Sequence, residues 1–113
     1  MTKRKKTKIT ALDVELAVAF HFNYRRNLIV PNVHWGIGLL YEADLVVLRP
    51  SNWAIEVEIK VSKSDLKADL RKRHHHDAKC FRELWFAVPE ELADSEYIPE
   101  HAGILSINRD TPS

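Results

Sequence analysis

A single cysteine, Cys80, occurs among the 113 residues, which excludes a disulfide within the chain. This agrees with a reducing compartment, because disulfides form and persist in oxidising ones. The sequence also lacks any apolar run near the roughly 20 residues of a membrane span, and its basic N-terminus enters no apolar segment of the signal-peptide kind. We therefore expect a soluble cytoplasmic protein without a membrane partner, in which Cys80 is a buried packing residue.

Acidic residues are missing from the first eight positions, where five basic residues lie: Lys3, Arg4, Lys5, Lys6 and Lys8. The remaining 12 basic and 16 acidic residues give the rest of the chain a formal charge of −4. We expect residues 1–8 to be a disordered basic arm and residues 9–113 to be one domain. Such an arm is typical of a protein that binds a polyanion, so we take its residues as candidate nucleic-acid contacts. A solvated tail that only improves solubility is the alternative.

Internal repeats are absent, and apolar periodicity predicts the order helix, three strands, helix, two strands. Thr10 and Asp13 form a capping-box pattern, so the first helix is expected to start near Thr10 and to run to Phe22. Strands are expected at 27–33, 41–50, 53–61, 83–89 and 103–108, and a second helix at about 63–79. Ser62 and Asp65 form a capping-box pattern before this second helix, whose inward anchors are expected to be Leu66, Leu70 and Phe81. The sequence therefore predicts a three-layer α/β domain with a small mixed sheet flanked by helices.

The first helix carries a carboxylate in an apolar arc. Leu12, Leu16 and Phe20 lie close together on the helix surface, in an arc typical of a buried face, whereas Ala17 falls on the opposite arc. Glu15 lies within the apolar arc, which is an unusual place for a charged side chain.

A second carboxylate interrupts an apolar strand. Both faces of the strand at 41–50 are largely apolar, so we expect it to be buried on both sides, and Asp44 lies within it. An unpaired buried carboxylate costs several kcal/mol, so Asp44 needs a partner. If this strand pairs antiparallel with the next one around a turn near Ser51, Asp44 and Glu58 are brought to the same end of the sheet.

Two neighbouring carboxylates repel each other unless a cation lies between them. Hard divalent ions such as Mg²⁺ prefer oxygen ligands, which Asp44, Glu58 and the main-chain carbonyl of Ile59 would supply. Lys60 is two residues beyond Glu58 and therefore projects from the same face of its strand, where it is suited to stabilise charge on a phosphate or to orient water. Glu15 is the candidate that would complete the metal shell, directly or through water.

The element order, with an acid in the first helix, an aspartate on the second strand and Glu-x-Lys on the third, resembles the PD-(D/E)XK nuclease superfamily. The segments "YEADLVVL", "EVEIKVSKSDLKADLRKRHHH" and "LWFAVPEEL" resemble a small bacterial and phage subgroup of the DNA-repair, MmcB-like kind. The resemblance covers about residues 10–107. It implies a restriction-endonuclease-like core, Asp44 and Glu58 as ligands of Mg²⁺ or Mn²⁺, Lys60 as the catalytic lysine and Glu15 as the auxiliary acid. The proline of the family motif is missing, because Ala43 precedes Asp44.

A basic stripe follows the Glu-x-Lys motif. Lys63, Lys67 and Arg71 are spaced four residues apart, so they share one face of the expected second helix and are candidate phosphate contacts. The alternative is a solvated helix face on which Asp65 and Asp69 are the partners of these cations.

Three consecutive histidines occupy positions 74–76. His76 and Cys80 have the spacing of half a zinc site, but no other cysteine is present, so we do not expect zinc. The resemblance favours His74 and His76 as contacts to phosphate or to the edge of the active site. Core or sheet-face positions are expected for Trp35, Trp53 and Trp85, with stacking on a base as the alternative for Trp35.

The combined pattern predicts a metal-dependent nuclease, an endonuclease that hydrolyses DNA in repair, recombination or phage DNA processing, with RNA as the other candidate substrate. A non-catalytic nucleic-acid-binding module with a nuclease fold is the first alternative. The second is a structural or protein-interaction domain in which Glu56, Glu58 and Lys60 form ion pairs with the second helix. Three roles are open for Glu56: an ion pair with that helix, a solvated position, or an acid that contacts the metal ligands without binding the metal itself. A homodimer or a partner protein is equally open.

Overall fold

The computed structural model describes residues 8–33, 43–51, 53–69 and 81–110. Along the chain these residues form α1 (Ala11–His21), β1 (Leu28–Val33), β2 (Ala43–Leu48), β3 (Ala54–Ile59), α2 (Lys63–Asp69), β4 (Glu83–Pro89), the 3-10 turn η2 (Glu90–Leu92) and β5 (Gly103–Ile107). The predicted order of helices and strands is therefore confirmed, and the predicted span of β4 agrees residue for residue. No helix in the described ranges is both long enough and apolar enough to cross a membrane.

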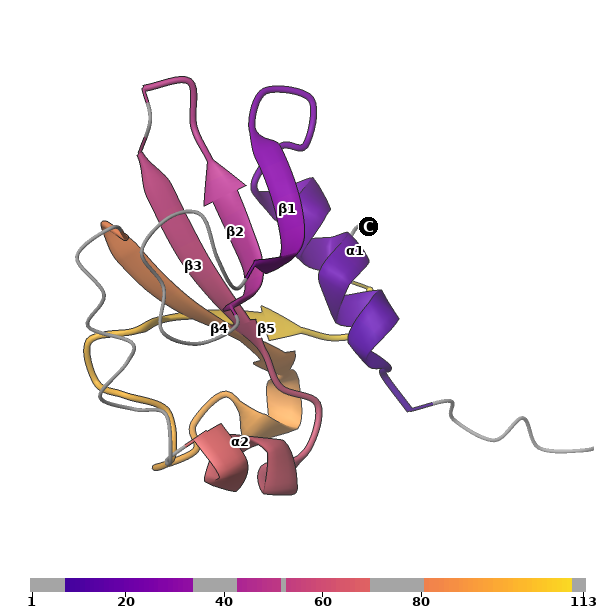
Figure 1. The fold of residues 1–113 in the computed structure, drawn as a ribbon. Helices are drawn as coiled ribbons and strands as arrows, with labels where there is room; N and C mark the ends of the chain where they lie inside the picture. The colour runs from indigo at the N-terminus through magenta and orange to yellow at the C-terminus, as the bar shows by residue number, and fades with distance from the viewer. Residues whose placement is uncertain (1–7, 34–42, 52, 70–80, 111–113) are drawn as a thin grey trace, which may run out of the picture.

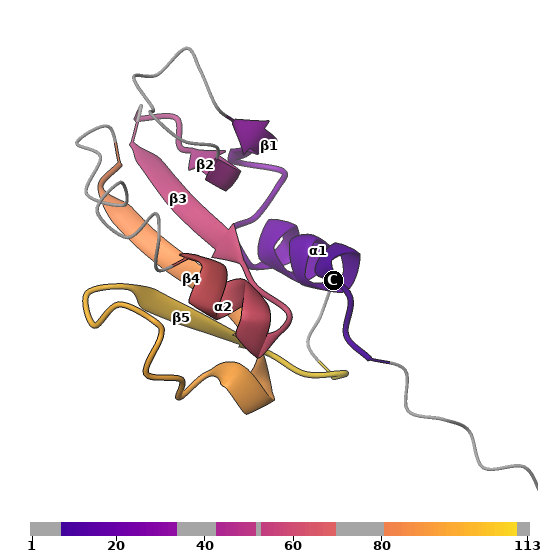
Figure 2. The same ribbon diagram turned by 60° about the horizontal axis from the view of Figure 1, so that its bottom comes forward.

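The five strands form one mixed sheet in the order β1-β2-β3-β4-β5. β1, β2 and β3 pair antiparallel, whereas β3, β4 and β5 pair parallel. The two helices lie on either side of this sheet (Figures 1 and 2). The predicted three-layer α/β architecture with a small mixed sheet is confirmed.

Each helix covers one face of the sheet. Val14, Ala17, Val18 and Phe22 of α1 and its C-cap pack against side chains that alternate along β2 and β3, namely Leu45, Val47, Ile55 and Val57. On the other face, Leu66 of α2 packs with Leu84, Phe86 and Val88 of β4. Leu66 is fully buried, as predicted for an inward anchor of this helix. The expected continuation of α2 to residue 79, with its anchor Leu70, lies outside the described residues.

The first helix begins with the predicted capping box. The main-chain N–H of Asp13 donates to Thr10 Oγ1 at 3.2 Å, and the N–H of Thr10 donates back to Asp13 Oδ2 at 2.8 Å. The hydrogen bonds from Thr10 lower the pKa of Asp13, because they favour its charged form. Both N-terminal donors that this pair satisfies would otherwise lack a partner within the helix.

The predicted buried face of α1 was wrong. Leu12, Leu16 and Phe20 are 62%, 49% and 52% exposed, whereas Ala17, assigned to the opposite arc, is buried with Val14. The helix is apolar on two sides, so periodicity alone does not say which side meets the sheet. The structure buries the side with the smaller side chains, which lets the helix backbone approach the sheet closely.

Candidate active site

Asp44 and Glu58 meet across the β2–β3 pair. The register pairs Leu45 with Val57, so the next position places Asp44 opposite Glu58. The main-chain N–H of Asp44 donates to Glu58 Oε2 at 3.2 Å, and the N–H of Ile59 donates to Asp44 Oδ2 at 2.9 Å. The predicted convergence of these two residues at one end of the sheet is confirmed, and each carboxylate is held by a main-chain donor of the other strand.

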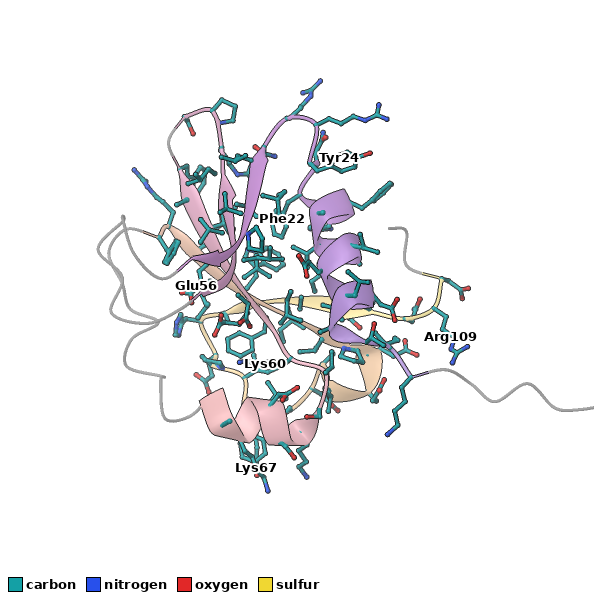
Figure 3. All side chains as sticks on the ribbon, turned by 45° about the vertical axis from the view of Figure 1, so that its right-hand side comes forward. Phe22, Tyr24, Glu56, Lys60, Lys67 and Arg109 are labelled. Carbon is teal, nitrogen blue, oxygen red and sulfur yellow. The ribbon has the colours of Figure 1, made fainter. Side chains whose placement is uncertain are left out.

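Three charged side chains leave β3 on the face that α1 does not cover. Glu56, Glu58 and Lys60 alternate with the apolar residues that pack toward α1. Glu56 and Glu58 have no exposed surface, and only 7% of Lys60 is exposed. Lys60 lies between β3 and α2 (Figure 3). Its ammonium is 3.8 Å from Glu58 Oε1, and its main-chain N–H donates to the carbonyl of Ala87 on β4 at 3.2 Å.

Burial changes the charge state of Glu58. Loss of solvation raises the pKa of this carboxyl from 4.5 to about 8, and the negative charges of Asp44 and Glu56 act in the same direction. The Lys60 ammonium and the N–H of Asp44 oppose this shift but do not cancel it. Glu58 therefore keeps its proton at neutral pH unless a further positive charge approaches the cluster.

The donor set fits Mg²⁺ through two carboxylates. This ion is commonly held by one or two carboxylates while it keeps several waters, and a cation beside Asp44 and Glu58 would offset the repulsion that raises the pKa of Glu58. Among the described residues, no group of three or more His, Cys, Asp or Glu side chains is arranged to hold a metal ion. Glu15 lies on α1, which packs against the opposite face of the sheet, so its predicted role as an auxiliary acid gains no support and stays a prediction. The carbonyl of Ile59 as a ligand also stays a prediction.

Glu56 is buried two residues before Glu58. It lies opposite Val46 of β2 and beside Leu84 of β4 in the sheet register. Full burial rules out the solvated role that the sequence left open. Its charge adds to the negative potential that raises the pKa of Glu58.

The turn between β3 and α2 is closed by two hydrogen bonds of Asp65. The N–H of Asp65 donates to Ser62 Oγ at 3.1 Å, and the carboxylate of Asp65 accepts from the N–H of Val61 at 3.2 Å. The predicted capping pattern of the second helix is thus present. The Asp65 carboxylate is held by this cap, and its pairing with the basic stripe stays a prediction.

Lys63 of the predicted basic stripe lies in acidic surroundings. Lys63 lines a hollow of about 400 Å³ together with Glu91, Asp94 and Glu96. Lys67 is exposed on the far side of α2 (Figure 3), with its ammonium 5.6 Å from the centre of the Tyr97 ring. Three carboxylates beside Lys63 oppose the approach of a polyanion.

Several residues with predicted roles lie outside the described residues. They are Lys3, Arg4, Lys5 and Lys6 of the arm, Trp35, and Arg71, His74, His76 and Cys80 after α2. Their predicted roles stay predictions.

No local pattern in the sequence predicts a second polar site. Trp53 and Trp85 were expected only as core or sheet-face residues, and Arg26 and Arg49 were given no role. The structure brings Arg26, Arg49 and Trp85 to one hollow at the end of the sheet away from Glu58. Their separation along the chain left no local pattern from which this grouping could be recognised.

Comparisons with known proteins support the fold. No family model and no curated protein matches the chain. Among solved structures, a protein of unknown function from Silicibacter pomeroyi matches with a TM-score of 0.68 and 23% sequence identity. The match covers 84% of this chain and 62% of that one, so this chain spans less than two thirds of the neighbour's length. The likeness shows a shared α/β fold.

Proposed function

We propose that this protein is a metal-dependent phosphodiesterase that hydrolyses nucleic acid, with DNA as the substrate. One observation carries the proposal: the carboxylates of Asp44 and Glu58 each accept a main-chain N–H from the other's strand, and the ammonium of Lys60 lies 3.8 Å from Glu58 Oε1. Two acids and a lysine on adjacent strands are also the pattern on which the resemblance to PD-(D/E)XK nucleases depends.

Asp44 and Glu58 are the residues that would hold Mg²⁺, which supplies a Lewis acid and lowers the pKa of the water that it binds. The N–H of Ile59 orients Asp44, and the N–H of Asp44 orients Glu58, so both carboxylates are placed before a substrate arrives. The ammonium of Lys60 supplies a fixed positive charge for the charge that develops on a phosphate. Glu58 gives up its proton when a cation binds, because the added positive charge favours its ionised form.

Cleavage assays with Lys60→Ala test the catalytic assignment. Purified protein is incubated with single-stranded, duplex, flap and junction DNA and with RNA, in Mg²⁺, in Mn²⁺ and in EDTA. We expect cleavage that requires the metal and that falls by a factor of about 100 or more in Lys60→Ala. Arg109→Ala is the control, because it removes one positive charge from an exposed position outside the cluster. Equal trace activity in wild type and Lys60→Ala would reject the assignment.

A non-catalytic nucleic-acid-binding module is the second candidate. It is favoured by the lack of a third metal-binding side chain beside Asp44 and Glu58 in the described ranges. Calorimetric titration with Mn²⁺ separates the two functions. Binding that is lost in Asp44→Asn supports the enzyme, whereas the absence of any such binding, with DNA binding retained, supports the module.

A further inference from the structure

A polar hollow lies at the end of the sheet that is distant from Glu58. It has a volume of about 520 Å³, within the usual range of ligand sites, and is formed by the end of α1, the loop after it, the end of β2 and the start of β4. Figure 1 shows the ends of α1 and β2 at the same end of the molecule. The polar and aromatic residues that line the hollow include His21, Asn23, Arg26, Arg49, Glu83 and Trp85.

Positive charge prevails in this hollow. Arg26 and Arg49 carry permanent charges, whereas Glu83 is the one acidic side chain among the described residues that line it. The carboxylate of Glu83 is already engaged, since its Oε1 accepts from the indole N–H of Trp85 at 2.9 Å. An anion that enters the hollow therefore meets two guanidinium groups and one carboxylate. That carboxylate already accepts a hydrogen bond from the Trp85 indole N–H.

Arg49 packs against the ring of Trp53, a residue that does not line the hollow. Its guanidinium carbon lies 5.5 Å from the centre of the Trp53 ring, and that of Arg82 lies 5.7 Å from the same ring. Arg49 Nε is buried and makes no hydrogen bond within the described part of the chain. A buried donor without an acceptor is costly, so this nitrogen favours an acceptor supplied by a ligand.

The surrounding loop extends the basic and aromatic surface. Tyr24 is 56% exposed at this end of α1 (Figure 3), and the guanidinium carbon of Arg25 lies 5.9 Å from the centre of its ring. Guanidinium groups bind phosphate oxygens through paired hydrogen bonds, and exposed aromatic rings stack on bases. Arginine beside exposed aromatic rings is typical of surfaces that bind single-stranded nucleic acid.

We propose that this hollow is a phosphate-binding site for a nucleic-acid strand, with Arg26 and Arg49 as the phosphate ligands and Tyr24 as a stacking platform. It is separate from the carboxylate cluster. Ala54, at this end of β3, is four residues from Glu58, or about 13 Å along the strand. The hollow also opens beside α1, whereas Glu58 and Lys60 project from the other face of the sheet. The proposal therefore stands even if the protein does not cleave nucleic acid.

Fluorescence anisotropy with a labelled single-stranded oligothymidylate tests the site on the full chain. EDTA is present so that cleavage does not interfere, and the salt concentration is varied. We expect Arg26→Ala and Arg49→Ala each to weaken binding about tenfold and to reduce the slope of log K against log salt by about 0.7. Arg49→Lys should lose part of this affinity, because a lysine keeps the charge without the paired donors.

Competition distinguishes the sources of the phosphate. Displacement by thymidine monophosphate and by inorganic phosphate assigns the hollow to a terminal or free phosphate, and displacement by oligothymidylate alone assigns it to a backbone phosphate. Arg109→Ala is the charge-matched control, since Arg109 is exposed near the start of α1 and Tyr24 lies beyond its end (Figure 3). Arg26 is exposed, so Arg26→Ala remains informative if Arg49→Ala does not fold, as checked by circular dichroism. Affinity that is unchanged in Arg26→Ala, or reduced equally in Arg109→Ala, would overturn the proposal.

Discussion

The raised pKa of Glu58 predicts that the metal-free protein becomes less stable as the pH rises. An unfolded chain ionises this carboxyl near 4.5, whereas the folded protein holds its proton up to a pKa of about 8. Between these two values the folded state binds more protons than the unfolded state, so stability falls with increasing pH. The full contribution is present below pH 4.5 and is lost by the time the pH has passed 8.

The size of the effect follows from the two pKa values. A difference of 3.5 pH units corresponds to about 5 kcal/mol at 1.36 kcal/mol per unit. This contribution is comparable with the total stability of about 5–15 kcal/mol of an ordinary domain. Glu58→Gln removes the titrating group with little change in shape.

Urea denaturation of wild type and Glu58→Gln from pH 5 to pH 9 in EDTA measures this contribution. We expect the free energy of unfolding of wild type to fall relative to that of the variant by up to about 1.4 kcal/mol per pH unit. Adding Mg²⁺ above pH 8 should restore stability to wild type and not to Glu58→Gln. The same urea series on Glu100→Gln is the control, because it shows how the loss of an exposed carboxylate changes the free energy of unfolding with pH. A difference between wild type and Glu58→Gln that stays constant across this range would refute the reasoning.

Two further predictions concern the framework around the site. Gly103→Ala should destabilise the protein by about 1–3 kcal/mol, because the added Cβ would lie 2.6 Å from an atom of the Trp85 ring. Differential scanning calorimetry measures this loss of stability. An unchanged melting temperature would contradict the prediction. Thr10→Ala should cost about 1 kcal/mol through loss of the cap with Asp13, whereas Thr10→Ser should retain most of it. Urea midpoints that do not separate the two Thr10 variants would show that the cap contributes little.

The parts of the fold that were predicted correctly from the sequence are those that depend on residues close together along the chain. The capping pair Thr10 and Asp13 located the start of α1, and an apolar run that ends at Pro89 located β4. The pairing of Asp44 with Glu58 followed from their symmetric distances to a turn near Ser51. These inferences depend on residues that are close in sequence or related by one hairpin.

The features that the sequence did not predict have a common physical cause, which is packing between segments that are distant along the chain. Leu12 and Val14 are both apolar helix residues, and only contact with the sheet determines that Val14 is the buried one. The burial of Glu56 likewise depends on what covers β3 rather than on the strand itself. The hollow around Arg49 is assembled from four segments of the chain, so no spacing of residues within one segment predicts it.

The most direct test of the proposed active site is a crystal soaked with Mn²⁺ at a pH above 8, with the ion located by its anomalous scattering. At this pH Glu58 is expected to be ionised and Asp44 is held beside it by the N–H of Ile59. The proposed site predicts an anomalous peak between the two carboxylates, within coordination distance of an oxygen from each. A well-ordered cluster with no peak there at saturating Mn²⁺ would contradict the proposed metal-dependent function.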